Sequence, residues 1–515
     1  MNVVVIGNGM VGSRFVDELV SQDPEVQVTV LGKERHLPYN RVLLSSVVAG
    51  KTDAESLAMA CADSERVRVL TGVPAIDIDR AARTVTDATG EVHTYDRLVF
   101  ATGSQARIPN IHGIATDRGL MPGVSVLKDL DDAQGILAVL PKARRAVVLG
   151  AGVLGLEVAT GLASRGLTVT LVHHSDRLME RQLGDAAATI ATGSLQRLGV
   201  KVVTQTSVAQ ALDRRGVLAS VRLTDGSELL TDLLVMCAGT IPEAALARRA
   251  GLPCERGILT GADLASPSDP AVFAIGDCAQ PPEGGSGLVA QGWEQASRLV
   301  ALWTADAPAE QAEPATPASA GPHVDEDVLD VTNVVRVKAM GLDVVTMGLS
   351  GKFDHGERDL RAVRMADPAI GRFVEVVVSH GLLVGATVVG DKQCASELSA
   401  MYTRMLPVPS DPAHLIVRPL AGAARPAAAS AADMADEDTV CQCNSVPKGR
   451  IVAAVKDGCT SVEEVSRATR ASTGCGDCRS LVGDIIRTCD VPDQGADAGE
   501  DTKFPALAGT GEVVR

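Results

Sequence analysis

The sequence has few aromatic residues, no excess of positive charge and no long apolar run. Aromatic side chains make up 2% of the 515 residues, which argues against recognition of nucleic acid by base stacking. The formal net charge of −16 repels phosphate backbones and anionic lipids, so neither nucleic acid nor a membrane is an expected partner. No apolar stretch approaches the roughly 20 residues that a membrane span needs. We therefore expect a soluble protein.

The eleven cysteines do not have the pattern of a disulfide framework. Their number is odd, most of them are scattered, and the strand-like segment 2–6 stands where a secretory signal would begin. No pair has the C-x4-C spacing of a redox-active disulfide. We expect a reducing cytoplasm, where clustered thiols more often bind metal than each other.

The length and the 46% hydrophobic content predict about three to four domains. Residues 1–303 alternate short apolar runs with helical periodicity, which is typical of an α/β protein with parallel sheets. Segments 304–327 and 421–438, rich in Ala and acidic residues, are expected to be linkers, and 492–515 a disordered tail. The intervening segment 328–420 contains strand-like runs and predicts a small α+β domain.

Two glycine-rich loops predict two Rossmann-like dinucleotide-binding folds. The first is Gly7-Asn8-Gly9-Met10-Val11-Gly12 and the second is Gly150-Ala151-Gly152-Val153-Leu154-Gly155. Each follows an apolar strand and precedes a helical run, and glycine is needed there because backbone N–H groups must approach a pyrophosphate closely. Two such folds, the second inserted in the first, suit hydride transfer from a nicotinamide to a flavin.

A cluster of thiols near the C-terminus predicts a metal centre. It comprises Cys441, Cys443, Cys475 and Cys478. A helix over 448–456 and a second helix starting at Ser461, with Glu464 completing a capping box, return the chain so that the two pairs can meet. Four thiolates accept zinc or a [2Fe-2S] cluster, but zinc sites usually present C-x-x-C on both sides, and here the first pair is C-x-C.

Residues 1–303 resemble the flavoprotein family that includes rubredoxin and ferredoxin reductases and the flavin half of NAD(P)H-nitrite reductase large subunits. Besides the glycine loops, the motifs that carry the resemblance are Leu37–Ser45, Tyr95–Gly103, Cys237–Pro242 and Val272–Cys278. The resemblance implies an FAD-binding domain at 1–110 and 242–303 and an NAD(P)H-binding domain at 111–241.

The resemblance also implies a set of cofactor-binding residues. For FAD the set is Gly7, Gly9, Gly12, Glu34, Arg41, Ala75, Thr102, Gly103, Gly276 and Asp277, and for NAD(P)H it is Gly150, Gly152, Gly155, Glu157, His173 and Gly239. Arg41 is expected near the pyrophosphate, the Ala75 backbone at the adenine and Asp277 at the ribityl chain. His173 stands where an acidic ribose ligand is usual, which leaves NADH and NADPH both open. No residue is assigned a catalytic role.

The thiol cluster, at 439–491, resembles the bacterioferritin-associated-ferredoxin-like (BFD-like) [2Fe-2S] domain. The order of domains resembles the N-terminal part of nitrite reductase large subunits and the electron-transfer subunit of assimilatory nitrate reductase. It implies a separate molybdenum or siroheme reductase as protein partner. The alternatives are a reductase for nitrite reductase, rubredoxin or ferredoxin, and a cluster-based iron-responsive docking or sensing protein.

Overall fold

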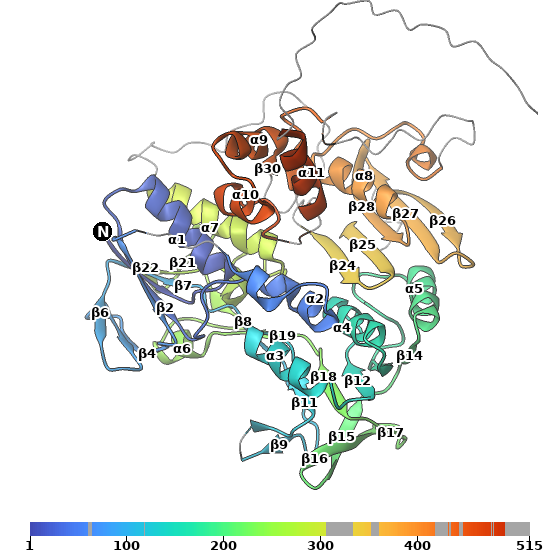
Figure 1. Ribbon diagram of the computed structural model, residues 1–515. Helices are drawn as coiled ribbons and strands as arrows, with labels where there is room; N and C mark the ends of the chain where they lie inside the picture. The colour runs from blue at the N-terminus through green and yellow to red at the C-terminus, as the bar shows by residue number, and fades with distance from the viewer. Residues whose placement is uncertain are drawn as a thin grey trace, which may run out of the picture. The chain divides into compact units, whose positions relative to one another are not determined.

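The computed structural model describes residues 1–59, 64–117, 119–304, 333–351, 360–417, 431, 434–441, 446–474, 476 and 478–489 (Figure 1). The chain divides into two compact units, residues 1–424 with 473–476 and residues 425–472 with 477–515. Nearly all of the expected linker 304–327, most of the expected linker 421–438 and the whole tail 492–515 lie outside the described residues.

The first sheet has the strand order β21-β22-β7-β1-β2-β3, in which all pairs except β21 with β22 are parallel. Its strands are β1 (Asn2–Ile6), β2 (Gln27–Gly32), β3 (Val67–Thr71), β7 (Arg97–Phe100), β21 (Ala265–Ser266) and β22 (Asp269–Ala274). Side chains of β1 alternate between two apolar cores, because both faces of the sheet are buried. Helices α1 (Met10–Gln22) and α7 (Val289–Thr304) cover one face, and α6 (Ala245–Arg249) lies against the other.

The second sheet repeats this plan with the order β11-β18-β12-β13-β14, all parallel. Its strands are β11 (Val124–Val126), β12 (Arg145–Leu149), β13 (Thr168–Val172), β14 (Val200–Val203) and β18 (Leu233–Met236). Helices α3 (Leu130–Val139), α4 (Val153–Ser164) and α5 (Asp185–Arg197) pack on one face, together with α2 (Leu44–Ala49). In both sheets the strand before the glycine loop has its sequence neighbour on one side and a later strand on the other, which is the position where such folds bind ligands.

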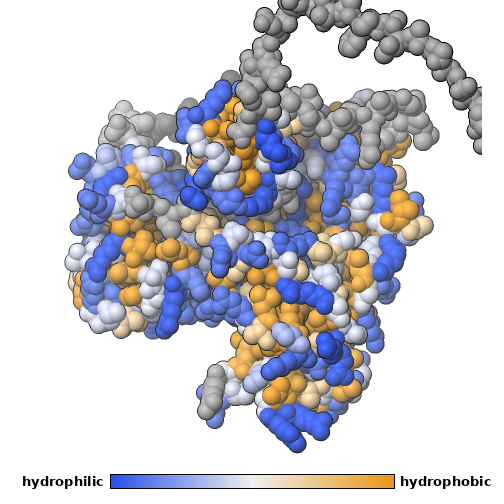
Figure 2. Space-filling view, viewed as in Figure 1, coloured by the Kyte–Doolittle hydropathy of each residue, from blue (hydrophilic) through white to orange (hydrophobic). Residues whose placement is uncertain are grey.

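An antiparallel three-stranded sheet follows β3 in the first fold and β14 in the second. These are β4 (Ala75–Asp79), β5 (Thr84–Asp87) and β6 (Val92–Thr94) in the first fold, and β15 (Val208–Arg214), β16 (Val217–Leu223) and β17 (Glu228–Leu230) in the second. One face of the β15–β17 sheet belongs to a buried core with the second parallel sheet. Its strands also expose Val217 and Leu230, and Figure 2 shows apolar side chains interspersed with hydrophilic ones over this lower lobe.

The chain crosses between the two folds through a two-stranded antiparallel ribbon of β8 (Ser104–Ala106) and β19 (Thr240–Pro242). Further short strand pairs lie in the described residues of this part of the chain. They include β9 (Ala115–Thr116) with β10 (Gly119–Leu120), and β20 (Ile258–Leu259) with β23 (Ala279–Gln280). The insertion of the second fold between β7 and β22 of the first is therefore visible in the strand order.

A five-stranded antiparallel sheet follows, in the order β24-β25-β28-β27-β26. Its strands are β24 (Val334–Ala339), β25 (Leu342–Gly348), β26 (Arg361–Asp367), β27 (Arg372–Ser379) and β28 (Leu382–Val389). One face packs on α8 (Lys392–Thr403), and part of the other joins the core of the second fold.

The described residues of the C-terminal unit form three helices and a short strand pair. These are α9 (Lys448–Lys456), α10 (Val462–Thr469), α11 (Arg479–Cys489), β29 (Thr439–Cys441) and β30 (Val446–Pro447). The expected helix over 448–456 is confirmed, and α10 begins after Ser461 in a capping box with Glu464. None of the helices in the described part of the chain is long and apolar enough to cross a membrane. The expected fold class, two Rossmann-like folds with an α+β part and a small helical module, is confirmed.

Candidate functional site

The first glycine loop connects β1 to α1, and its three glycines meet different surroundings. Gly7 has a φ of +114°, and a Cβ there would lie 2.2 Å from the Ala101 carbonyl oxygen. A Cβ on Gly12 would lie 2.3 Å from the Gly7 carbonyl oxygen. At Gly9, by contrast, the nearest atom to an added Cβ is an Arg41 guanidinium nitrogen at 3.6 Å. Gly7 and Gly12 are thus required by the fold itself, whereas Gly9 faces open space where a ligand can approach the backbone.

The second loop, between β12 and α4, has the same three environments. Gly150 has a φ of +107° and lies against the Cys237 carbonyl, and a Cβ on Gly155 would lie 1.8 Å from the Gly150 carbonyl oxygen. Around Gly152 no atom lies within 4 Å of an added Cβ. This correspondence gives each fold a glycine-lined cradle at a helix N-terminus, which suits a pyrophosphate.

Glu34 and Arg41, which follow β2, form one hydrogen-bonded group with Tyr39. The Glu34 carboxylate accepts hydrogen bonds from the Arg41 guanidinium at 2.8 Å and from the Tyr39 hydroxyl at 2.6 Å. Burial would raise the pKa of Glu34, but Arg41 and Tyr39 outweigh it, so that the pKa lies below its ordinary value. An ionised carboxylate and a cation therefore lie together beside the first glycine loop. The predicted contacts of Glu34 and Arg41 with FAD stay predictions.

Asp277 lies in a second polar group, after β22, that includes a residue which the sequence reasoning missed. Its carboxylate accepts a hydrogen bond from the Ser104 hydroxyl at 2.6 Å, and the Lys128 ammonium lies 3.7 Å away. Lys128 also donates to the Ser104 oxygen at 2.7 Å. Burial lowers the pKa of Lys128, and the attraction of Asp277 offsets this only in part. Lys128 belongs to the inserted fold and carries no motif, so no local signal could have identified it.

The remaining residues of the first set lie at the same edge of the first sheet or on its β4–β6 extension. Thr102 and Gly103 follow β7, and both bond to the backbone of Glu243, which follows β19. The Thr102 hydroxyl donates to the Glu243 carbonyl at 2.6 Å, and the Glu243 N–H donates to the Gly103 carbonyl at 2.9 Å. Gly276, with a φ of +73°, follows β22, and Ala75 begins β4. Since the carboxyl ends of parallel strands share one edge, the structure brings most of the set together.

In the second fold, His173 follows β13 and Gly239 follows β18, whereas Glu157 points elsewhere. The Glu157 side chain is buried in α4 and accepts hydrogen bonds from the Ser45 hydroxyl at 2.6 Å and from the Lys338 backbone N–H at 2.8 Å. Both carboxylate oxygens are therefore engaged within the protein. A contact between Glu157 and NAD(P)H stays a prediction.

Within the C-terminal unit, the Cys441 and Cys478 thiols lie together although 36 residues separate them in the chain. Both are buried, and the hydrogen bond between them, together with burial, raises the pKa of Cys478. Cys443 and Cys475 lie outside the described residues. Two buried thiols in contact fit soft-metal ligation and supply half of the predicted set.

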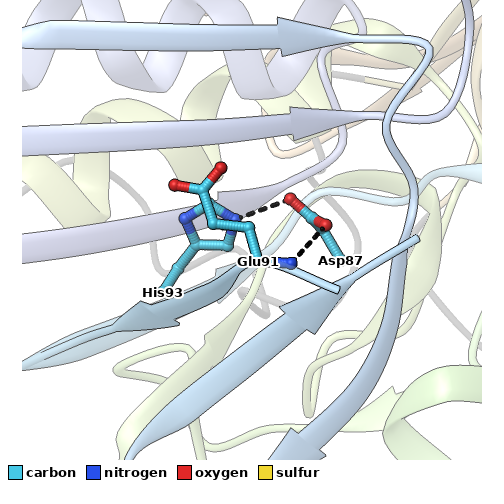
Figure 3. Close-up of side chains that lie close together, drawn as sticks. All are labelled: Asp87, Glu91 and His93. Carbon is cyan, nitrogen blue, oxygen red and sulfur yellow. Dashed lines mark hydrogen bonds and ion pairs between the residues drawn. The ribbon is translucent and has the colours of Figure 1, made fainter. Parts of the chain in front are cut away.

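A second group of potential metal ligands lies in the β5–β6 hairpin: Asp87, Glu91 and His93 (Figure 3). Here the ligand atoms already have partners. One Asp87 oxygen accepts bonds from Thr89 and the Glu91 backbone, and the other lies 2.8 Å from the His93 ring. Both Glu91 oxygens accept bonds from the Arg68 guanidinium. The proximity of these three side chains is therefore explained by hydrogen bonds that stabilise the β5–β6 turn, without a metal ion.

Comparison with known proteins identifies the family. The model of the pyridine nucleotide-disulphide oxidoreductase family matches residues 1–299, and that of the BFD-like [2Fe-2S] binding domain matches residues 439–488. The chain belongs to the pyridine nucleotide-disulphide oxidoreductase family. As a member it is an FAD-dependent NAD(P)H oxidoreductase, and its second matched domain binds a [2Fe-2S] cluster, so the predicted enzyme class and cofactors are confirmed.

Several relatives of this oxidoreductase contain both parts. It is 31% identical over 490 residues to a nitrite reductase [NAD(P)H] of Bacillus subtilis, covering 94% of this chain and 57% of the relative. It is also 31% identical over 495 residues to the assimilatory nitrate reductase electron transfer subunit of the same organism, covering 94% and 59%. The chain therefore spans somewhat more than half the length of these two relatives.

Solved structures show the same reductase fold. The putidaredoxin reductase in its covalent complex with putidaredoxin matches with a TM-score of 0.68 and 26% identity, over 80% of this chain and 95% of that one. The ferredoxin reductase for the CYP199A2 system of Rhodopseudomonas palustris matches with a TM-score of 0.63 and 25% identity, over 75% and 91%. The residue assignments within the family fold remain predictions, and they can be tested individually.

We expect Lys128 to contribute to retention of FAD in this oxidoreductase. Replacing Lys128 by methionine leaves Asp277 without its half-buried cation and should weaken FAD binding about tenfold, the effect of losing one charged hydrogen bond. Titration of the apoprotein with FAD measures this. Lys142→Met, at an exposed lysine, is the control. Equal FAD affinity in both variants would contradict a role for Lys128.

Proposed function

We propose that this oxidoreductase takes electrons from NAD(P)H and delivers them through its [2Fe-2S] module to a separate terminal reductase, of the assimilatory nitrate reductase type. The observation that carries the proposal is the presence of three sites in one chain: two glycine-lined cradles and a buried thiol pair. Each corresponds to one stage of an electron relay.

The cofactors supply the redox chemistry and the chain supplies their positions. When bound, FAD accepts two electrons as a hydride from the nicotinamide and releases them singly, and a [2Fe-2S] centre carries one electron at a time. Gly9 and Gly152 offer backbone N–H groups to the two pyrophosphates. Arg41 and Lys128 add positive charge at the edge of the first sheet, and Cys441 and Cys478 present thiols for the cluster.

The nature of the acceptor is supported by the relatives. One of them is named as an electron transfer subunit of assimilatory nitrate reductase, and its similarity extends over 94% of this chain, including the thiol module. Others are named as nitrite reductases, which makes a nitrite-reducing partner the second candidate. In either case the partner would be a separate reductase subunit that contains a molybdenum or siroheme centre.

The proposal predicts a division between electron uptake and anion reduction. The purified chain, with FAD and iron present, should oxidise NAD(P)H with ferricyanide on the order of 100-fold faster than the mixture without protein. It should leave nitrate and nitrite unchanged until a catalytic nitrate reductase subunit is added, when nitrite should form.

The assay distinguishes the two candidates directly. A nitrite reductase catalytic subunit replaces the nitrate reductase subunit in a parallel reaction, and ammonium is measured. Coupling to the nitrite enzyme alone would replace the first candidate by the second. Reduction of either anion by the chain alone would contradict the proposed relay.

A further inference from the structure

The segment after β13, residues 173–183, is attached to the second glycine loop on both sides of Ala151. The Ala151 N–H donates to the Nδ1 atom of His173 at 3.3 Å, and the Met179 N–H donates to the Ala151 carbonyl at 3.0 Å. Met179 has a φ of +45°, a backbone angle that residues other than glycine rarely adopt. Such backbone strain persists where surrounding contacts impose it, and here it turns the chain directly before Glu180.

This turn places the Glu180 carboxylate against the His173 ring. Because Nδ1 of His173 accepts from Ala151, its Nε2 carries the hydrogen and donates to Glu180 at 2.9 Å. The His173 side chain is 4% exposed and that of Glu180 is 29% exposed. A molecule that approaches this end of β13 therefore meets the carboxylate and not the imidazole.

The charges of the pair follow from these contacts. Burial lowers the pKa of His173, and Glu180 offsets this only in part, so the ring is neutral at pH 7. Burial would raise the pKa of Glu180, but hydrogen bonds from its own backbone N–H and from His173 outweigh it and keep the pKa below its ordinary value. The net charge of the pair is negative.

The guanidinium of Arg177, one of two arginines in this segment that could bind a phosphate, is already engaged. It donates to the carbonyls of Leu183 and Glu180, each at 3.0 Å, and lies 3.0 Å from the Asp176 carboxylate and 3.6 Å from that of Asp185. A bare 2′-phosphate would have to displace these contacts. It would also meet the carboxylates of Asp176 and Glu180 in the segment and that of Asp185 just after it.

We propose that Glu180, positioned by His173, accepts hydrogen bonds from the adenosine ribose hydroxyls and makes the enzyme selective for NADH over NADPH. The inference rests on the proposed oxidation of NAD(P)H and names the nucleotide. His173 occupies the position after β13 where an acidic residue usually binds this ribose, and Glu180 supplies the carboxylate from seven residues further along the chain. His173 is thus a positioning residue.

The test compares nucleotides across matched variants of the full chain. Glu180→Gln removes the charge and keeps the shape, and Glu228→Gln makes the same change in β17 of the same fold. Arg181→Met removes an exposed cation next to Glu180, which a 2′-phosphate site would need. The kcat/KM values with NADH and NADPH are measured with ferricyanide, and the dissociation constants of NAD⁺ and NADP⁺ by calorimetry.

The wild type should prefer NADH by about tenfold or more, the effect of a charged hydrogen bond. In Glu180→Gln the kcat/KM with NADH should fall about tenfold through KM, with kcat retained, because the ribose lies far from the reacting ring. The Glu228→Gln and Arg181→Met variants should keep the wild-type ratio.

Several outcomes would overturn the inference. They are a preference of the wild type for NADPH, an unchanged NADH/NADPH ratio in Glu180→Gln, or loss of NADPH use in Arg181→Met. If Glu180→Gln does not fold, the affinities of the wild type for ADP-ribose and for 2′-phospho-ADP-ribose are compared instead. Tighter binding of the phosphorylated ligand would contradict the proposal. Oxidation of neither nucleotide would instead refute the proposed function.

Discussion

Replacement of Cys478 by serine should remove the iron–sulfur cluster and leave FAD bound. The Cys478 thiol is buried against Cys441 in a unit with its own apolar core, and the FAD-binding residues lie in the other unit. Iron should fall from about two atoms per chain to nearly none, together with the cluster absorbance. Dye reduction by NAD(P)H should persist, whereas transfer to a partner reductase should fall by on the order of 100-fold.

Cys459→Ser is the matched control, because Cys459 is partly buried in the same unit and has no partner at ligand spacing in the sequence. Cys443→Ala tests a ligand position outside the described residues and should behave as Cys478→Ser does. Simultaneous loss of FAD and iron in Cys478→Ser would contradict the separation of the two sites. Retention of full iron would remove Cys478 from the ligand set.

Replacement of Gly9 by alanine should strongly weaken FAD binding in a chain that still folds. Gly9 has a φ of −88° and open space where the Cβ would lie, so alanine strains nothing in the protein. The methyl group would occupy the approach to a pyrophosphate and remove about one charged hydrogen bond, which contributes about 1.5–3 kcal/mol. FAD affinity should fall by on the order of 100-fold.

Gly152→Ala is the complementary variant, since Gly152 has a φ of −76° and equally open surroundings in the second fold. It should retain FAD and raise KM for the nicotinamide nucleotide. Gly7→Ala should fail to fold, because its Cβ would overlap the Ala101 carbonyl. The circular dichroism spectrum shows which of the variants fold, and the FAD content shows which of the folded variants have lost the flavin. Normal FAD binding by Gly9→Ala would exclude this loop as the pyrophosphate cradle.

The sequence alone determined those features that depend on local chemistry. The glycine loops, their flanking strands and helices, and the capping box at Ser461 are encoded within short segments, because the φ angles, close contacts and caps involve neighbouring residues. The cysteine spacing likewise indicated a thiolate centre before any contact was known. Local signals of this kind identified both dinucleotide folds and the [2Fe-2S] module.

Only the tertiary structure decided which distant side chains meet. Lys128 approaches Asp277 across 149 residues, and Glu157 is held by Ser45 and Lys338 on other elements. His173 is seven residues from Glu180, yet their contact depends on the left-handed Met179 and its bond to Ala151. The charge presented to a bound nucleotide depends on these contacts, because burial and hydrogen bonding set which groups are ionised and which face the ligand.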